Sequence, residues 1–82
     1  MKIIFTKSSE KELASLEKPL QRKIFNKIKT LSEDPYPYGS QKLEGGKGYR
    51  LRVGNYRVVY EVFKDKLIIV VIKIAHRKDV YR

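Results

Sequence analysis

The sequence predicts an α+β domain, with an N-terminal strand and an αα-hairpin packed on a mostly antiparallel four-stranded sheet in the order β-α-α-β-β-β. Three observations support this fold class. Apolar residues recur every three or four positions between residues 13 and 31, as on helices that face a core. Two runs rich in β-branched and aromatic residues flank Gly54-Asn55, and a continuous apolar run follows at 67–72. The chain has 82 residues, which suits a single domain over residues 1–82.

Composition narrows the classes of protein and partner. Lys and Arg number 19 against 9 Asp and Glu, so the formal net charge is +10. This charge favours nucleic acid or another polyanion as partner, and a membrane surface is the weaker alternative. The chain has no cysteine, which excludes disulfides, thiolate metal sites and cysteine nucleophiles. Because no apolar run suits a signal peptide or a membrane span, we expect a soluble cytoplasmic protein.

The first strand and the two helices account for the N-terminal part of the chain. Residues 3–5 are apolar and predict a short strand. Ser9 followed by Glu12 has the spacing of a capping box, which predicts that a helix begins at Ser9. Pro19 cannot continue this helix but suits the first turn of another. The sequence therefore predicts two helices, over 9–16 and 18–31.

A loop rich in proline, glycine and tyrosine joins the helices to the remaining strands. Tyr36 and Tyr38 alternate with prolines, so this segment is expected to be a rigid loop. Its tyrosines either stack on nucleic-acid bases or close the edge of the core. The glycines at 45–48 are wrongly spaced for a Walker loop or a dinucleotide fingerprint, so no nucleotide cofactor is expected.

The two strands around Gly54-Asn55 are predicted to form a hairpin with a type II′ turn. This turn places Arg52 directly opposite Arg57 and puts Arg50 on the same face. Two arginines opposite each other cost up to about 1 kcal/mol relative to a neutral pair. We interpret the cluster as an anion site, because guanidinium groups bind phosphate with two parallel hydrogen bonds. A solvated outer face is the alternative.

The apolar run at 67–72 is expected to be the central strand, because both of its faces are apolar. A two-residue turn at Lys64-Asp65 would pair Arg57 with Ile72. If the strand stays regular, His76 then falls on the face of the arginines. His76 is therefore a candidate for proton transfer, with a structural role as the alternative.

In the segments described above, the chain resembles the RelE/ParE superfamily of toxin–antitoxin toxins. The hairpin pattern at 49–60 and the segment at 41–45 carry this resemblance, and the basic tail with its tyrosine at 76–81 is similar to the RelE branch. The resemblance implies a toxin that cleaves messenger RNA in the ribosomal A site, held in check by a small antitoxin. A gyrase poison of the same fold is one alternative, and a non-catalytic RNA-binding module is another.

The resemblance also implies a role for each of five residues. Arg50 and Arg52 correspond to basic residues before the turn, where well-known RelE toxins have lysines. Arg57 corresponds to the arginine that binds phosphate. Arg77 corresponds to the arginine near the leaving group, and Tyr81 to the tyrosine that meets the nucleotide beside the scissile bond.

The chemistry of RNA cleavage adds constraints of its own. The 2′-hydroxyl must lose a proton, the phosphorane charge must be stabilised, and the leaving 5′-oxygen must gain a proton. Arginines suit the charge stabilisation but do not lose a proton, so His76 and Tyr81 are the candidates for proton transfer. The sequence has no metal-ligating cluster, so we expect a metal-independent reaction with a 2′,3′-cyclic phosphate product. The positive charge predicts an acidic, partly helical antitoxin, beside the ribosome and messenger RNA as partners.

Overall fold

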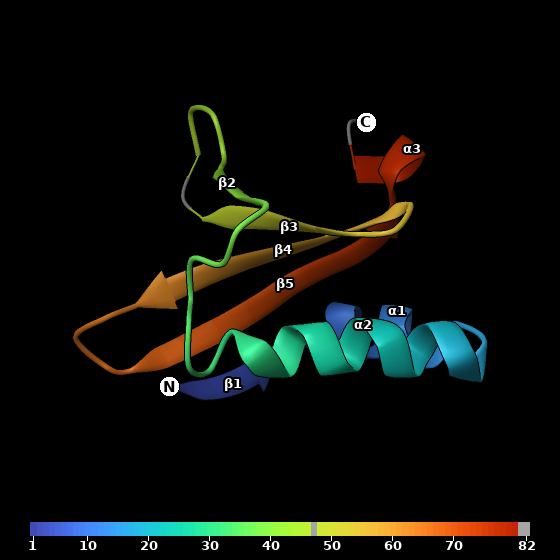
Figure 1. Cartoon of the computed structure of the whole chain (residues 1–82), viewed down its shortest axis with the longest axis horizontal. Coiled ribbons are helices and arrows are strands. Elements are labelled where there is room, and N and C mark those ends of the chain that lie inside the picture. Colours follow the sequence, from blue (N-terminus) through green and yellow to red (C-terminus); the bar gives the residue numbers. More distant parts are fainter. Residues whose placement is uncertain (47, 81–82) are drawn as a thin grey trace.

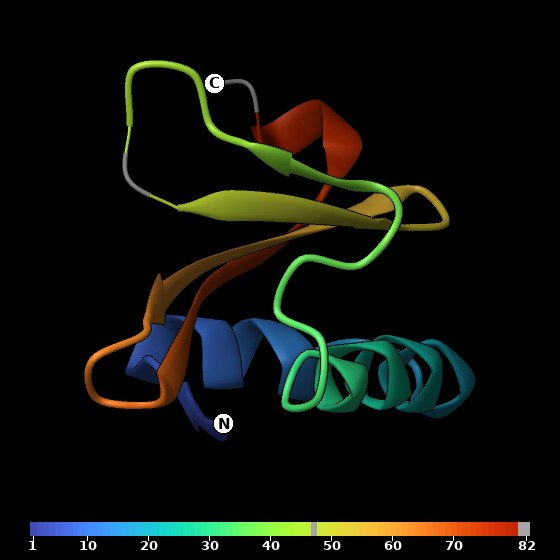
Figure 2. The same cartoon turned by 60° about the vertical axis from the view of Figure 1, so that its left-hand side comes forward.

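The two longer helices of this protein cover one face of a five-stranded sheet, as the computed structural model shows (Figures 1 and 2). The structure describes residues 1–46 and 48–80. In chain order the elements are β1 (Lys2–Phe5), α1 (Lys7–Ala14), α2 (Lys18–Thr30), β2 (Ser40–Lys42), β3 (Tyr49–Val53), β4 (Tyr56–Phe63), β5 (Ile68–His76) and α3 (Arg77–Val80). No helix in the described ranges has the length and apolar character to cross a bilayer. The predicted α+β class is confirmed.

The sheet has one strand more than the four predicted. Its order is β1-β5-β4-β3-β2, in which β1 runs parallel to β5 and the other neighbours are antiparallel. The missed strand β2 is short and polar, so no apolar alternation marks it in the sequence. β5 lies inside the sheet, as its apolar run predicts, although β4 is the middle strand.

The core lies between helices α1 and α2 and the sheet face that they cover (Figure 2). Tyr60 of β4 is completely buried in it. The other buried apolar residues of the core come from the α2 region and from strands β3, β4 and β5. The other buried apolar residues are Ile24, Ile28, Leu31, Leu51, Val53, Val58, Ile69, Val71 and Ile74. The hairpin arginines point away from this core, which leaves the opposite face of β3 and β4 for a polar site.

Helix α1 begins earlier than the capping-box spacing predicts. Thr6 is its N-cap, and the Thr6 Oγ1 accepts a hydrogen bond from the Ser9 backbone N–H at 3.1 Å. Ser9 is completely buried inside the first turn, so the prediction that the helix begins there is wrong. Both residues have capping chemistry, and the sequence alone does not rank them. The predicted second helix agrees with α2 to within one residue at its end.

Ser9 and Glu12 instead support a β-bulge at Ile72 in β5. Ser9 Oγ donates to the carbonyl oxygen of Val71 at 2.8 Å, just before the bulge. Glu12 Oε1 accepts from the N–H of Ile74 at 2.9 Å, just after it. The Val71 carbonyl oxygen also accepts from the Thr6 backbone N–H at 3.0 Å, so Ser9 adds a second donor there, whereas Glu12 gives the Ile74 N–H an acceptor from α1.

Glu12→Ala is therefore expected to lower the free energy of unfolding by about 1–2 kcal/mol, because it leaves the Ile74 N–H without an acceptor. Glu12→Gln keeps an acceptor oxygen and should cost less than half as much. Glu10→Ala is the matched control, since it removes an exposed carboxylate from the same helix. Urea denaturation measures all three, and equal losses in Glu12→Ala and Glu10→Ala would contradict the role of Glu12.

The bulge also decides which face His76 occupies. The connection from β4 to β5 is two residues longer than the predicted turn, which alone would preserve the predicted faces. The bulge adds a shift of one residue and reverses them. Arg57 therefore pairs with Ala75 rather than Ile72, and His76 pairs with Tyr56 on the core side of the sheet. The prediction that His76 shares a face with the arginines is wrong.

Candidate functional site

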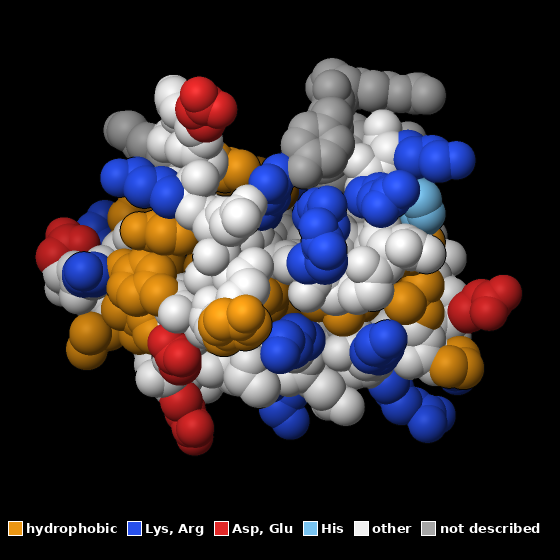
Figure 3. Space-filling view, turned by 45° about the horizontal axis from the view of Figure 1, so that its top comes forward, with side chains coloured by type: hydrophobic (Ala, Val, Ile, Leu, Met, Phe, Trp, Pro, Cys, Tyr) orange, Lys and Arg blue, Asp and Glu red, His pale blue; other side chains and the backbone are white. Residues whose placement is uncertain are grey.

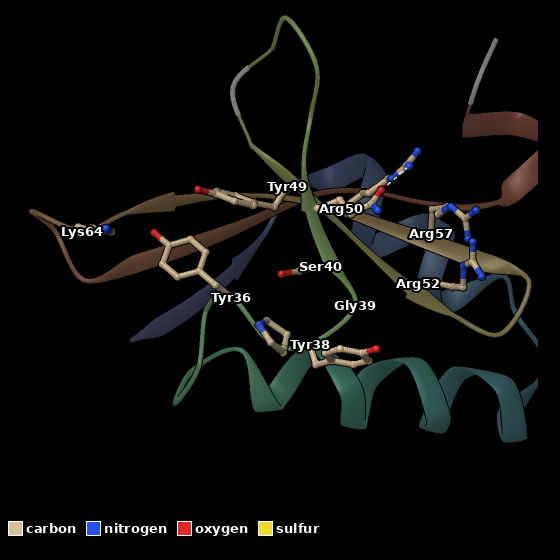
Figure 4. A pocket seen from close by; sticks show the side chains of 11 residues that line it. Tyr36, Tyr38, Gly39, Ser40, Tyr49, Arg50, Arg52, Arg57 and Lys64 are labelled. Carbon is tan, nitrogen blue, oxygen red and sulfur yellow. Dashed lines mark hydrogen bonds between the residues drawn. The ribbon is translucent and has the colours of Figure 1, made fainter.

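A cleft of about 860 Å³ opens where the loop between α2 and β2 passes over strands β3 and β4 (Figure 4). Among the residues that the structure describes, three arginines and three tyrosines line it, and none of these described lining residues is Asp or Glu. The described residues that line it are Tyr36, Pro37, Tyr38, Gly39, Ser40, Gln41, Tyr49, Arg50, Arg52, Arg57 and Lys64. The cleft is thus a cationic site with aromatic walls.

The hairpin brings the arginines together as its turn predicts. Gly54 has a φ of 60°, as the first central residue of a type II′ turn requires. Arg52 lies opposite Arg57 in the β3–β4 ladder, which confirms the predicted register. Figure 4 shows their guanidinium groups beside each other at one end of the cleft.

Arg57 is the most unusual residue of the site. Its side chain is only 6% exposed. Its Nε and Nη1 atoms are buried and have no hydrogen-bond partner within the described part of the chain. A buried guanidinium without a counter-ion is costly, and native proteins rarely leave such donors unsatisfied. A phosphate in the cleft would provide both the charge and the acceptor oxygens.

The two other arginines differ in how they are held. Arg50 is half-buried, and its Nη2 donates to Gln41 Oε1 at 2.6 Å. Gln41 lies on β2, where it pairs with Arg50 across the ladder. Because β2 is short and polar, no pattern in the sequence predicts this contact. Arg52 is exposed and also borders a second hollow, of about 500 Å³, which lysines of α2 line.

The positive charge extends beyond the cleft. Lys23 and Lys27 of α2 line the second hollow together with Arg52. Figure 3 shows Lys and Arg side chains gathered in the middle of one face, with the acidic side chains at its margins. Such a surface attracts a polyanion over a wider area than the cleft alone.

Most of the aromatic wall is anchored to the core. The Tyr36 ring lies 4.9 Å from that of Tyr49, which in turn lies 5.9 Å from that of Tyr60. The Tyr60 hydroxyl donates to the Pro35 carbonyl oxygen at 2.8 Å, and burial raises the pKa of this hydroxyl above its usual range. Tyr36 therefore closes the edge of the core, whereas Tyr38 is fully exposed.

His76 lies outside the cleft. Its ring meets the Tyr56 ring edge-on, with centroids 5.4 Å apart. Its Nδ1 accepts a hydrogen bond from the Lys78 backbone N–H at 3.3 Å. These contacts fit the structural alternative for this histidine.

The tail returns to the tip of the hairpin. The backbone N–H of Arg77 donates to the Asn55 carbonyl oxygen at 2.8 Å, which places α3 beside the β3–β4 turn (Figure 1). The Arg77 side chain is exposed and does not line the cleft. Tyr81 lies outside the described residues. The cleft thus unites Arg50, Arg52 and Arg57, and the tail lies at the nearby turn.

Comparison with known proteins places the chain in a family. The family model of the ParE toxin of the type II toxin-antitoxin system, parDE, matches residues 3–81. A protein of Escherichia coli named as a RelE-like toxin is 34% identical over 82 residues, covering 94% of this chain and 85% of that one. A protein of Methanocaldococcus jannaschii named as a RelE toxin is 34% identical over 76 residues, covering 88% and 84%.

Solved structures agree with these relatives. The archaeal RelE–RelB complex from Pyrococcus horikoshii contains a chain with a TM-score of 0.83 and 32% identity, covering 95% of this chain and 96% of that one. The Escherichia coli RelBE toxin–antitoxin complex gives a TM-score of 0.80 at 24% identity, covering 92% and 94%, and supports the fold alone. The chain belongs to the RelE/ParE superfamily of type II toxin–antitoxin toxins, within its RelE-like branch.

Proposed function

We propose that this toxin is a ribosome-dependent endoribonuclease that cleaves messenger RNA in the ribosomal A site and so arrests translation. The observation that carries the proposal is the buried guanidinium of Arg57, whose Nε and Nη1 have no partner among the described residues. It faces a cleft that carries two further arginines, and no carboxylate is found among the lining residues that the structure describes. A phosphodiester is the ligand that best matches these donors.

The proposed reaction transfers a phosphoryl group within the RNA, from the 5′-oxygen of one nucleotide to the 2′-oxygen of the nucleotide before it. The 2′-oxygen attacks the adjacent phosphorus, the bond from phosphorus to the 5′-oxygen breaks, and the products are a 2′,3′-cyclic phosphate and a 5′-hydroxyl. The 2′-hydroxyl loses one proton and the 5′-oxygen gains one. Arg57 would bind the phosphate, and Arg50 and Arg52 would stabilise the charge of the phosphorane.

Proton transfer needs groups other than the three arginines of the cleft. Arginines do not act as bases, and the position of His76 on the other side of the sheet argues against a role as proton shuttle. We propose Arg77 as the residue near the leaving oxygen, since its helix lies beside the hairpin tip. Tyr81 is the remaining candidate for orienting or accepting a proton.

The partners follow from the family and from the charge. The structural relatives from Pyrococcus horikoshii and Escherichia coli are toxin–antitoxin complexes, so we propose a cognate antitoxin that covers this toxin. A net charge of +10 favours an acidic, partly helical antitoxin with a segment that folds on binding. Action on ribosomes places the toxin in the cytoplasm.

Primer extension on a translated messenger RNA tests the activity. One reaction contains ribosomes and toxin, and a parallel reaction contains the same RNA and toxin without ribosomes. Cuts within A-site codons that require ribosomes are expected. Cuts in both reactions would indicate a free ribonuclease, and an absence of cuts with folded protein would favour gyrase as the target or an inactive toxin.

A further inference from the structure

Tyr38 has no structural role that the described residues reveal. Its side chain is 103% exposed, so it contributes almost nothing to the core. It nevertheless lines the cleft, and Figure 4 shows its ring extending toward the end where Arg52 and Arg57 lie. Exposing a large aromatic ring does not stabilise the fold, which favours a role for Tyr38 in binding a ligand at the proposed phosphate site.

The loop that carries Tyr38 is held on both sides. The Ser40 backbone N–H donates to the Pro37 carbonyl oxygen at 2.9 Å, which closes a turn around Tyr38. On the other side, the Tyr60 hydroxyl fixes Pro35, as described above. The Tyr38 ring is therefore presented from a fixed backbone, which lowers the entropy lost when it stacks on a ligand.

The ring of the neighbouring Tyr36 is covered by other side chains. The Tyr36 ring packs on Tyr49, and the Lys64 Nζ lies 5.2 Å from its centroid. A ring with a cation over it and another ring against it offers less area to a ligand. Among the described aromatic side chains that line the cleft, Tyr38 is thus the one whose face is open.

We propose that Tyr38 is a stacking platform for an RNA base that flanks the phosphate held by Arg57. The inference rests on the proposed function, and it assigns a second binding group to the same cleft. Single-stranded RNA combines a phosphate with an unstacked planar base, which matches a buried guanidinium beside an open aromatic ring. An acidic peptide would use the arginines but would leave the ring without a partner, so RNA is the better match.

Anisotropy of a fluorescein-labelled RNA tetranucleotide with 2′-O-methyl riboses, which the toxin cannot cleave, measures the contact on the full chain at low salt. Tyr38→Ala is expected to weaken binding by about 5- to 100-fold. Tyr38→Phe keeps the ring and should bind as the unmodified chain does. Tyr38→Leu keeps apolar area without a π-face and should resemble Tyr38→Ala. None of these variants should change the melting temperature.

An abasic RNA series then identifies the base. Removing the base that stacks on Tyr38 should weaken binding to the unmodified chain, and should have little further effect in Tyr38→Ala. Arg57→Ala is the reference for the phosphate contact. Its loss of RNA binding, together with unchanged binding in Tyr38→Ala, would overturn the stacking proposal and leave the proposed function standing.

Two further outcomes would also overturn the proposal. One is a Tyr38→Ala variant that binds RNA normally but binds a polyglutamate peptide less tightly, which would assign the ring to an acidic protein partner. The other is a lack of RNA binding in solution combined with unchanged ribosomal cleavage by Tyr38→Ala. Weaker ribosomal cleavage by Tyr38→Ala, rescued in Tyr38→Phe, would instead support stacking on the ribosome-bound messenger RNA.

Discussion

Arg57→Leu is expected to make the protein inactive and more stable at the same time. Cleavage of messenger RNA should fall by a factor of about 100 or more, since the variant lacks the group that we propose binds the phosphate. The free energy of unfolding should rise by about 1–2 kcal/mol. Primer extension with ribosomes measures the first effect, and urea denaturation the second.

The expected gain in stability follows from the environment of Arg57. Folding removes its guanidinium from water without giving Nε and Nη1 a partner. The residue directly across the ladder is Arg52, so the neighbouring charge is repulsive. Leucine fills much of the space of the arginine stem and needs no hydrogen bonds. The native arginine is therefore retained at a cost to the fold, which is typical of a binding site.

Arg52→Leu is the matched control. It relieves the same repulsion across the ladder, but Arg52 is exposed and loses no desolvated donor. Its effect on stability should lie within about 0.5 kcal/mol, so the difference between the two variants reports the burial of Arg57. If Arg57→Leu instead destabilised the protein like an ordinary core truncation, the guanidinium would have to be satisfied within the fold, and the phosphate-site argument would fail.

The hairpin is the part of the site that the sequence predicts in full. The two-residue turn at Gly54-Asn55 fixes the pairing of its flanking strands, because each following pair depends on the one before. The opposition of Arg52 and Arg57 is therefore a local property. The burial of Arg57 is not local, since it depends on how the rest of the fold covers the hairpin.

The register of β5 could not be predicted in the same way. Residues 67–72 are apolar on both faces, so no alternation in the sequence marks the extra residue at Ile72. The groups that support the bulge are Ser9 and Glu12, which lie on α1 about 60 residues earlier in the chain. The face of His76 thus depends on contacts between distant segments, and a reading of the strand alone places it wrongly.

Gly48→Ala is expected to be the most destabilising single methyl addition in the glycine-rich segment before β3. Gly48 has a φ of +117°, and a Cβ built there would lie 2.7 Å from the Tyr60 carbonyl oxygen. The backbone of Tyr60 cannot move away easily, because its side chain is buried in the core and its hydroxyl is bound to Pro35. Strain in φ and the clash together should cost about 3 kcal/mol or more.

Two nearby glycines separate these two causes. Gly46→Ala meets its nearest atom at an ordinary 3.9 Å, and its effect should lie within about 0.5 kcal/mol. Gly45 has a φ of +67° but open space around it, so Gly45→Ala should show the cost of φ alone, about 1 kcal/mol. Urea denaturation of the three variants should give the order Gly48, Gly45, Gly46. Equal losses at Gly45 and Gly48 would show that the close approach to Tyr60 does not matter.

Gly48→Ala also links the stability of the fold to the geometry of the cleft. Gly48 precedes Tyr49, where β3 begins, and its carbonyl oxygen accepts from the Leu43 N–H at 3.0 Å. A shift of this backbone would displace β3 against β4 and β2, and with it the Arg50–Gln41 contact. Gly48→Ala should therefore reduce cleavage at temperatures where the protein is still folded, although every arginine is intact. Full activity in folded Gly48→Ala would indicate that the cleft tolerates displacement of β3.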